Sequence, residues 1–180
     1  MRPQPGEYAS YVQSDIDLVQ GDDVVKALES QVEDTLNLLR LVEDPLISYA
    51  VGKWTLKQVV GHMSDDERIF AYRCLCLARN DLRQLPGFNE KLYADFAGSN
   101  ERPWADLLDE FRIVRASALV LFRGLPTEAW SRRGIVNGYS ATVRGLAFHI
   151  AGHELHHVRI IRNLYIRNAQ SREFPPRALL

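Results

Sequence analysis

Four long segments of the sequence repeat apolar residues at steps of three and four positions, which is the spacing of an amphipathic helix. No segment shows the sustained alternation of apolar and polar residues that marks a half-buried strand. The predicted helices cover about 22–43, 55–78, 100–124 and 140–168. Four amphipathic helices in one chain predict an all-α protein, folded as an antiparallel four-helix bundle.

Residues with known preferences for helix ends and turns support these boundaries. Asp22 or Asp23 is suited to cap the first helix, and Ser140 or Thr142 the fourth. "TLKQ" at 55–58 has the spacing of a capping box at the start of the second helix. For the third helix, Pro103 suits the first turn because its missing N–H would be unpaired there, and Gly124 marks the end. "NG" at 137–138 predicts a short hairpin before the fourth helix.

The linkers predict a single domain with one long connection. Residues 80–100 are too many for a tight bundle turn and mix aromatic residues with Gly and Pro, so we expect either a lid over a site or a crossover. The tail, residues 171–180, contains two adjacent prolines and is expected to be extended. The sequence has no internal repeat and no low-complexity stretch, so we expect one domain over residues 1–180.

Composition excludes several classes of function. The chain has 22 Lys and Arg against 23 Asp and Glu, so it lacks the basic footprint of a protein that binds nucleic acid or an anionic membrane. No stretch approaches the roughly 20 apolar residues of a membrane span, and the N-terminus does not resemble a signal peptide. We therefore expect a cytoplasmic protein with a small-molecule partner. Cys74 and Cys76 point to different sides of a helix and predict buried packing residues rather than a disulfide.

Four of the five histidines lie in the fourth predicted helix, within "HIAGHELHH". His149, His153 and His157 form one stripe at i, i+4 and i+8, whereas His156 is turned away from it. Two imidazoles one turn apart can bind the same divalent ion through bonds of about 2.0–2.1 Å. A tight site needs a third ligand, and His62, on the apolar face of the second helix, is the candidate. The alternative is a patch of solvated histidines.

The same stretch contains H-E-x-x-H, the motif of zinc peptidases, in which Glu154 would be the general base. The residues that follow lack the Gly and third His of metzincins, and Glu173 is the sole carboxylate after the motif. No strand pattern upstream would hold a peptide substrate. A peptidase is therefore the minor alternative.

Charged and aromatic residues near the predicted ligands have two interpretations. Asp66 and Arg73 follow His62 on its own stripe, and Asp66 is suited to orient a ligand imidazole. For these two residues and Glu67, an ordinary solvated charge run is an equal alternative. Four aromatic residues are candidates for a substrate mouth, with core packing as the alternative: Trp54, Tyr93, Phe96 and Trp104.

Three motifs appear in a characteristic order: Lys-Trp-Thr at 53–55, His62 seven residues later, and Gly-His-x-x-His-His at 152–157, with "LPGF" between them. In this order the chain resembles the DinB-like superfamily of metal-dependent hydrolases and thiol transferases, also called YfiT-like. The resemblance implies an up-down-down-up four-helix bundle with a long crossover and a homodimeric assembly. It also implies a divalent metal, Zn or Ni, held by His62, His153 and His157.

The activity implied by the resemblance is hydrolysis, or transfer of a low-molecular-weight thiol that serves as co-substrate. A three-histidine site with an open position suits either, because the metal can activate a water or bind a thiolate. The resemblance does not imply DNA binding. His149, which matches no ligand position, is expected in the pocket or behind the ligands, together with Asp66, Glu67 and Arg73, and His156 is expected to point outward. The alternative is a metal-binding dimeric bundle without catalysis.

Overall fold

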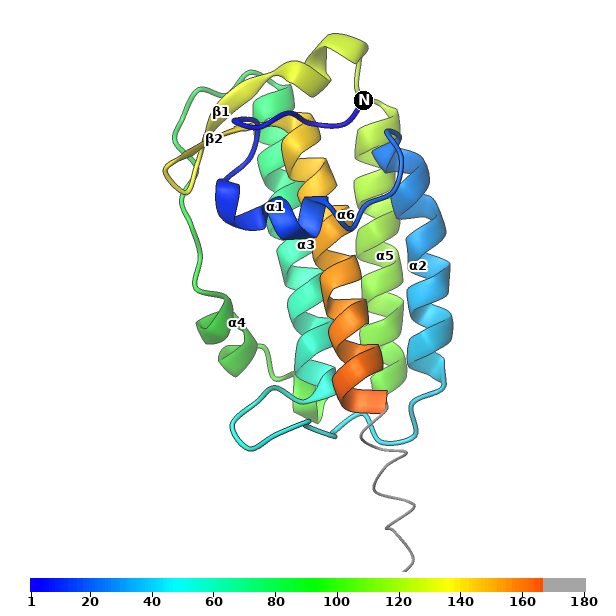
Figure 1. Cartoon of the computed structure of the whole chain (residues 1–180). Helices are drawn as coiled ribbons and strands as arrows, with labels where there is room; N and C mark the ends of the chain where they lie inside the picture. Colours follow the sequence, from blue (N-terminus) through cyan, green and yellow to red (C-terminus); the bar gives the residue numbers. More distant parts are fainter. Residues whose placement is uncertain (167–180) are drawn as a thin grey trace, which may run out of the picture.

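The computed structural model describes residues 1–166, so the predicted extended tail and the last residues of the fourth predicted helix lie outside the described part. Its long helices are α2 (Val24–Arg40), α3 (Leu56–Ala78), α5 (Trp104–Arg123) and α6 (Val143–Ile160). Helix α3 packs against α5 and α6, and α2 packs against the same two helices. Helices α3 and α5 run in the same direction, opposite to α2 and α6 (Figure 1). The predicted up-down-down-up four-helix bundle is confirmed.

Three of the four long helices begin with a side-chain cap. Asp23, Thr55 and Thr142 each accept a hydrogen bond from the backbone N–H three residues ahead, and at Thr55 both halves of the capping box form. Pro103 lies at the N-cap of α5, directly before its first turn, and Gly124 follows its last residue. Helix α2 ends at Arg40, slightly earlier than expected. The predicted helix starts therefore hold because they depend on local hydrogen bonds.

The connection between α3 and α5 is a crossover along the length of the bundle (Figure 1). It carries α4 (Glu90–Phe96) and the short 3-10 helix η2 (Ser99–Glu101). Leu85 ties it to the hairpin by two backbone hydrogen bonds, from its N–H to Ile135 and from Asn137 N–H to its carbonyl, both 2.9 Å. The connection thus forms one wall of the molecule.

The segment between α5 and α6 forms the predicted hairpin. The 3-10 helix η3 (Thr127–Ser131) leads into strands β1 (Arg133–Val136) and β2 (Tyr139–Thr142), which pair antiparallel. Asn137 and Gly138 have φ of 50° and 80°, as a two-residue type I′ turn requires. The hairpin ends directly at the N-cap of α6, so it fixes where that helix starts.

The first residues of the chain cross the outside of the bundle. They contain the 3-10 helix η1 (Ser10–Val12) and the short helix α1 (Gln13–Ile16), which packs on α6. A Cβ on Gly145 would lie 2.0 Å from the Glu7 carbonyl oxygen, and one on Gly152 would lie 2.3 Å from that of Asp15. These two glycines therefore let the N-terminal segment lie directly on α6. No pattern in the sequence predicts this contact.

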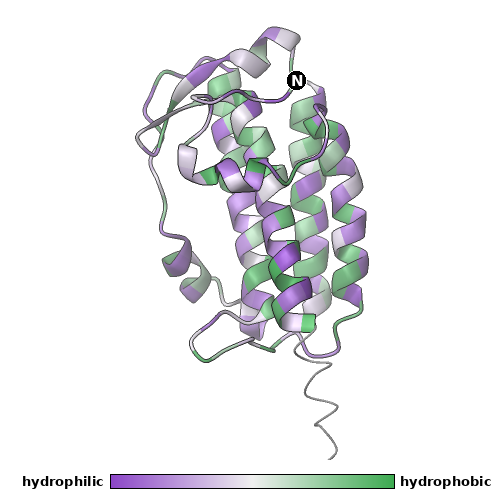
Figure 2. Ribbon diagram, viewed as in Figure 1, coloured by the Kyte–Doolittle hydropathy of each residue, from purple (hydrophilic) through white to green (hydrophobic). Residues whose placement is uncertain are grey.

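The core lies between the apolar faces of the four long helices. Hydrophobic and hydrophilic residues are interleaved along each of them, as amphipathic helices require (Figure 2). Cys74 and Cys76 are buried and free, as expected. Helix α6 continues as a π-helix, η4 (Ile161–Ile166). Within residues 1–166, every helix is too short or too polar to cross a membrane.

Candidate metal centre

The structure brings together the three histidines predicted as ligands. His62 in α3 faces His153 and His157 in α6, and their nearest ring nitrogens lie within 4.8 Å of one another. The Nε2 atom of His153 is 3.1 Å from the Nε2 of His62 and 3.1 Å from that of His157. His62 and His157 are buried, and His153 is partly buried. Three imidazole edges thus converge on one point.

Hydrogen bonding among the rings does not account for this convergence. A ring nitrogen carries either one proton or one lone pair, so the Nε2 of His153 cannot satisfy both neighbours at once. Tetrahedral ligands with bonds of about 2.0–2.1 Å stand about 3.3 Å apart, close to the spacing seen here. A divalent cation at the centre would satisfy all three nitrogens, and the residues present therefore fit a metal.

Burial keeps the three imidazoles neutral. It lowers the pKa of His62 to about 4 and the pKa of His157 to about 3, and it lowers the pKa of His153 well below its ordinary value. Mutual repulsion between the imidazolium forms adds to the effect at His153 and His157. Neutral imidazole is the form that binds metal, so near neutral pH no proton competes strongly for the site.

Asp66 lies behind the ligands, where the sequence placed it. Its Oδ2 atom is 3.3 Å from Nδ1 of His153 and 3.8 Å from Nε2 of His149. Burial raises the pKa of the Asp66 carboxyl well above its usual range, while Arg73 opposes this shift. Among the described residues, no group donates a hydrogen bond to Oδ2. A carboxylate on the far nitrogen of a ligand imidazole fixes ring orientation and increases ligand basicity.

His149 and His156 do not join the three ligands. His149 is buried against the ring of Phe70, 4.2 Å between centroids, and its Nε2 faces Asp66. The ring of His156 is turned to the N-terminal segment, where its Nδ1 is 3.1 Å from Asp15 Oδ1. Within residues 1–166 the group of nitrogens that can hold one ion therefore has three members, which leaves coordination positions for other molecules.

The three histidines open into a cavity of about 320 Å³. Trp54 lines it and packs on the His62 ring, 4.9 Å between centroids, whereas Tyr93, Phe96 and Trp104 do not line it. Sequence reasoning missed the walls formed by the N-terminal segment, the crossover and the hairpin turn. Among the described residues, the lining consists of Tyr11, Val12, Asp15, Trp54, His62, Asp66, Phe70, Arg73, Gly87, Phe88, Glu90, Asn137, His149, His153, His156 and His157.

Glu67 is not part of this cavity, contrary to our expectation. Its carboxylate accepts two hydrogen bonds from Arg115 of α5, at 2.7 and 3.0 Å. Glu154 accepts from the same guanidinium at 2.8 Å and from Thr35 at 2.6 Å. These four buried residues, the interior network, lie on the other side of α3 and α6. In the sequence, the residue that could have indicated the interior network is Arg115, a lone cation on the apolar face of the third predicted helix.

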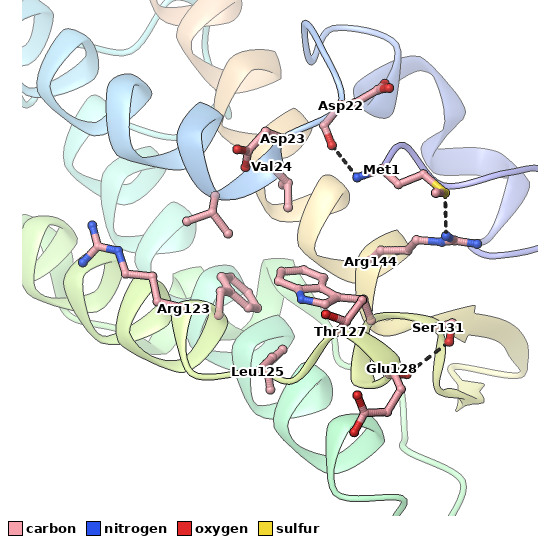
Figure 3. A pocket seen from close by; sticks show the side chains of 13 residues that line it. Met1, Asp22, Asp23, Val24, Arg123, Leu125, Thr127, Glu128, Ser131 and Arg144 are labelled. Atoms are coloured by element: carbon pink, nitrogen blue, oxygen red, sulfur yellow. Dashed lines mark hydrogen bonds between the residues drawn. The ribbon is translucent and has the colours of Figure 1, made fainter.

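A larger hollow of about 860 Å³ lies where α2 begins and α5 ends (Figure 3). The Met1 amine donates to the Asp22 carbonyl there, at 2.7 Å. Its described lining combines apolar residues such as Val24 and Leu125 with charged residues and includes no histidine or cysteine. The chemistry-bearing residues therefore belong to the smaller cavity.

Comparisons with known proteins agree with this geometry. A model of the DinB superfamily matches residues 27–161. The fold is similar to that of YfiT from Bacillus subtilis, described as a probable metal-dependent hydrolase with an unusual four-helix bundle topology. The TM-score is 0.69, with 17% sequence identity and 94% of each chain covered. No curated protein sequence matches.

Proposed function

Because the chain belongs to the DinB superfamily, we propose that it is a metal-dependent enzyme acting on a small molecule, with one divalent cation on His62, His153 and His157. The observation that carries this proposal is the convergence of three neutral imidazoles, two buried and one partly buried, in the lining of one cavity. The description of YfiT, whose fold the chain shares, as a probable metal-dependent hydrolase supports it.

A divalent ion with an open position lowers the pKa of a bound water to near neutrality and binds a thiol as the thiolate. The chain supplies the setting for either reaction. Asp66 is placed to hold the His153 ring, and the Trp54 ring packs on His62, restricting how these ligands can turn. The cavity volume suits a small ligand. Our proposal covers a hydrolase and a low-molecular-weight-thiol transferase, with Zn or Ni as the metal.

Elemental analysis of protein purified without a metal-affinity tag tests the proposal. We expect close to one Zn or Ni per chain. Absence of metal, even after reconstitution with each ion, would contradict it. Turnover of small esters and amides, compared with thiol-dependent turnover of an electrophile, then separates the hydrolase from the transferase.

A zinc peptidase is disfavoured by the position of Glu154. A general base must lie within hydrogen-bond reach of the reacting water or substrate, yet this carboxylate is held by Arg115 and Thr35 and does not line the cavity. We expect the Glu154→Gln variant to keep its metal and its turnover. Loss of turnover with the metal retained would support the peptidase instead.

The second alternative is a homodimeric bundle that binds metal without catalysis. A fourth protein ligand would favour that function, but His149 faces Asp66 rather than the three ligands. We propose a homodimer for the enzyme as well, and sedimentation equilibrium tests it. Relaxation of solvent protons, measured with a paramagnetic ion in the site, reports whether the bound metal exchanges water. A dimer whose metal exchanges no water would favour the non-catalytic alternative.

A further inference from the structure

Two arginines are buried in the part of the chain that the structure describes, and their surroundings differ. Arg115, 1% exposed, donates to two carboxylates and to the Leu28 carbonyl. Arg73, 4% exposed, makes one hydrogen bond within residues 1–166, to the Pro86 carbonyl at 2.7 Å, and no ion pair. Burying a cation without a carboxylate partner costs folding free energy. We therefore expect the partner of Arg73 to be a ligand in the cavity that it lines.

The Arg73 guanidinium lies against two aromatic rings. Its carbon lies 4.5 Å from the ring centroid of Phe70 and 5.7 Å from that of Phe88. Aromatic stacking of this kind takes the faces of the guanidinium and leaves its edges for hydrogen bonds. Pro86 occupies one N–H, and the remaining N–H groups can bind a planar anion through two parallel bonds.

The other charges around the cavity do not satisfy Arg73. Within the described residues it is the only Lys or Arg in the lining, and the carboxylates there are Asp15, Asp66 and Glu90. Asp15 faces His156, Asp66 faces two other histidines, and Glu90 is exposed, so water screens its charge. An anion next to Arg73 would thus meet a cation that forms no ion pair among the described residues, although its charge opposes the raised pKa of Asp66.

We propose that Arg73 anchors a carboxylate of the substrate, whose reacting group lies at the three-histidine end of the same cavity; this second part rests on the proposed function. Arg73 lies over Phe70, and the eight positions from Phe70 back to His62 span about 12 Å along the helix. A single cation suits a monoanion better than a phosphate, which carries a charge near −2. The substrate class is therefore a small, elongated carboxylic acid.

Calorimetric titration of the Zn-loaded protein with two series of hydroxamates tests this proposal. In both series a hydroxamate at one end of the ligand binds the metal. The other end carries a carboxylate in one series and the matching amide in the other, and each series contains alkyl linkers of increasing length. We expect one length at which the acid binds about 10- to 100-fold more tightly than the amide. Arg73→Met should abolish this preference, and Arg73→Lys should keep part of it.

Arg83→Met is the matched control because Arg83 pairs with Asp81 on the surface, outside the cavity lining. It should leave the preference unchanged. Equal binding of acid and amide by the unchanged protein would overturn the proposal. So would an equal loss of affinity for both series in Arg73→Met, since that pattern indicates a purely structural arginine.

A second arm separates this inference from the proposed function. Metal-free protein is titrated with hexanoate and hexanamide, which lack the hydroxamate, and the chemical shifts of the protein's backbone amides are followed by NMR. If the protein cannot be loaded with metal but still binds hexanoate in a way that depends on Arg73, the proposed function is contradicted and the role of Arg73 as an anchor is supported. No difference between hexanoate and hexanamide in this arm would overturn the anchor.

Discussion

Adjacent residues of the same two helices build two polar clusters with opposite properties. On α3, Asp66 faces the cavity and Glu67 faces the interior network; on α6, His153 and Glu154 divide in the same way. In the interior network the carboxylates are matched by the guanidinium of Arg115. In the cavity, Asp66 Oδ2 and Nδ1 of His149 and His157 have no hydrogen-bond partner among the described residues. Burial of polar groups therefore does not distinguish the two clusters, whereas unmet bonding capacity does.

The largest expected effect is on the cavity side. His157→Ala leaves two ring nitrogens, and two imidazoles leave the ion mostly hydrated, so we expect metal content to fall from close to one per chain to near zero. His156→Ala is the matched control and should keep the metal, because that ring faces Asp15. Both are measured by elemental analysis after dialysis. Metal lost in His156→Ala but kept in His157→Ala would reverse the ligand assignment.

The interior network should respond in the opposite way. Arg115→Met leaves two buried carboxylates without their cation, and we expect it to lower the free energy of unfolding by about 3–5 kcal/mol. Metal content per folded chain should not change. Arg123→Met, which breaks a surface pair with Glu29, should cost less than about 1 kcal/mol. Urea denaturation measures both, and an Arg115→Met protein as stable as the Arg123→Met protein would refute the distinction between the clusters.

An intermediate effect is expected at Asp66. Asp66→Asn keeps the size of the side chain but replaces one carboxyl oxygen behind His153 with an NH2 group, which cannot accept from the ring, and the affinity for Zn should fall about 10- to 100-fold. Asp65→Asn, next to it on α3 and paired with Arg68, should leave metal affinity unchanged. Competition with a chromogenic chelator gives both values. Equal affinities in the two variants would show that Asp66 does not act on the ligand.

The most gradual expected effect, spread over more than two pH units, is a pH dependence of stability in the metal-free protein. The pKa of His62 is about 4 in the folded chain and near 6.5 when unfolded, so between these pH values the unfolded chain binds the extra proton. Stability is fully present above pH about 6.5 and is lost as the pH falls toward 4, by at most about 1.4 kcal/mol per pH unit for this residue. His62→Gln should reduce that slope, as urea midpoints at fixed ionic strength will show. An unchanged slope would mean that His62 keeps its ordinary pKa in the folded chain, as a solvent-exposed histidine does.

Sequence reasoning succeeded where the signal was local. Helix caps at Thr55 and Thr142 depend on a few neighbouring residues, and the pair His153 and His157 needs only helical spacing. His62 was found because one lone histidine on an apolar face had to meet the others across the bundle.

The rest depends on contacts between distant segments. Glu67 follows Asp66 directly, but one step along a helix turns a side chain by about 100°, so the two residues face different neighbours. The neighbour of Glu67 is Arg115 on another helix, and this contact between distant segments decides its role. Phe88 and Asn137 reach the cavity only because the crossover is tied to the hairpin. No periodicity in the sequence predicts that contact.

The glycines of α6 have a consequence for how the cavity comes into existence. The N-terminal segment supplies a wall of it, and this segment is fastened to α6 by contacts such as that between Glu7 and Arg144, 137 positions apart. During synthesis this segment emerges well before α6, and its contacts with α6 form only after more than a hundred further residues have been made. A chain stopped before residue 143 has neither the histidine pair nor a surface for its own beginning. The cavity is thus assembled by closing the chain on itself, and an intact cavity indicates that the N-terminal segment has docked on α6.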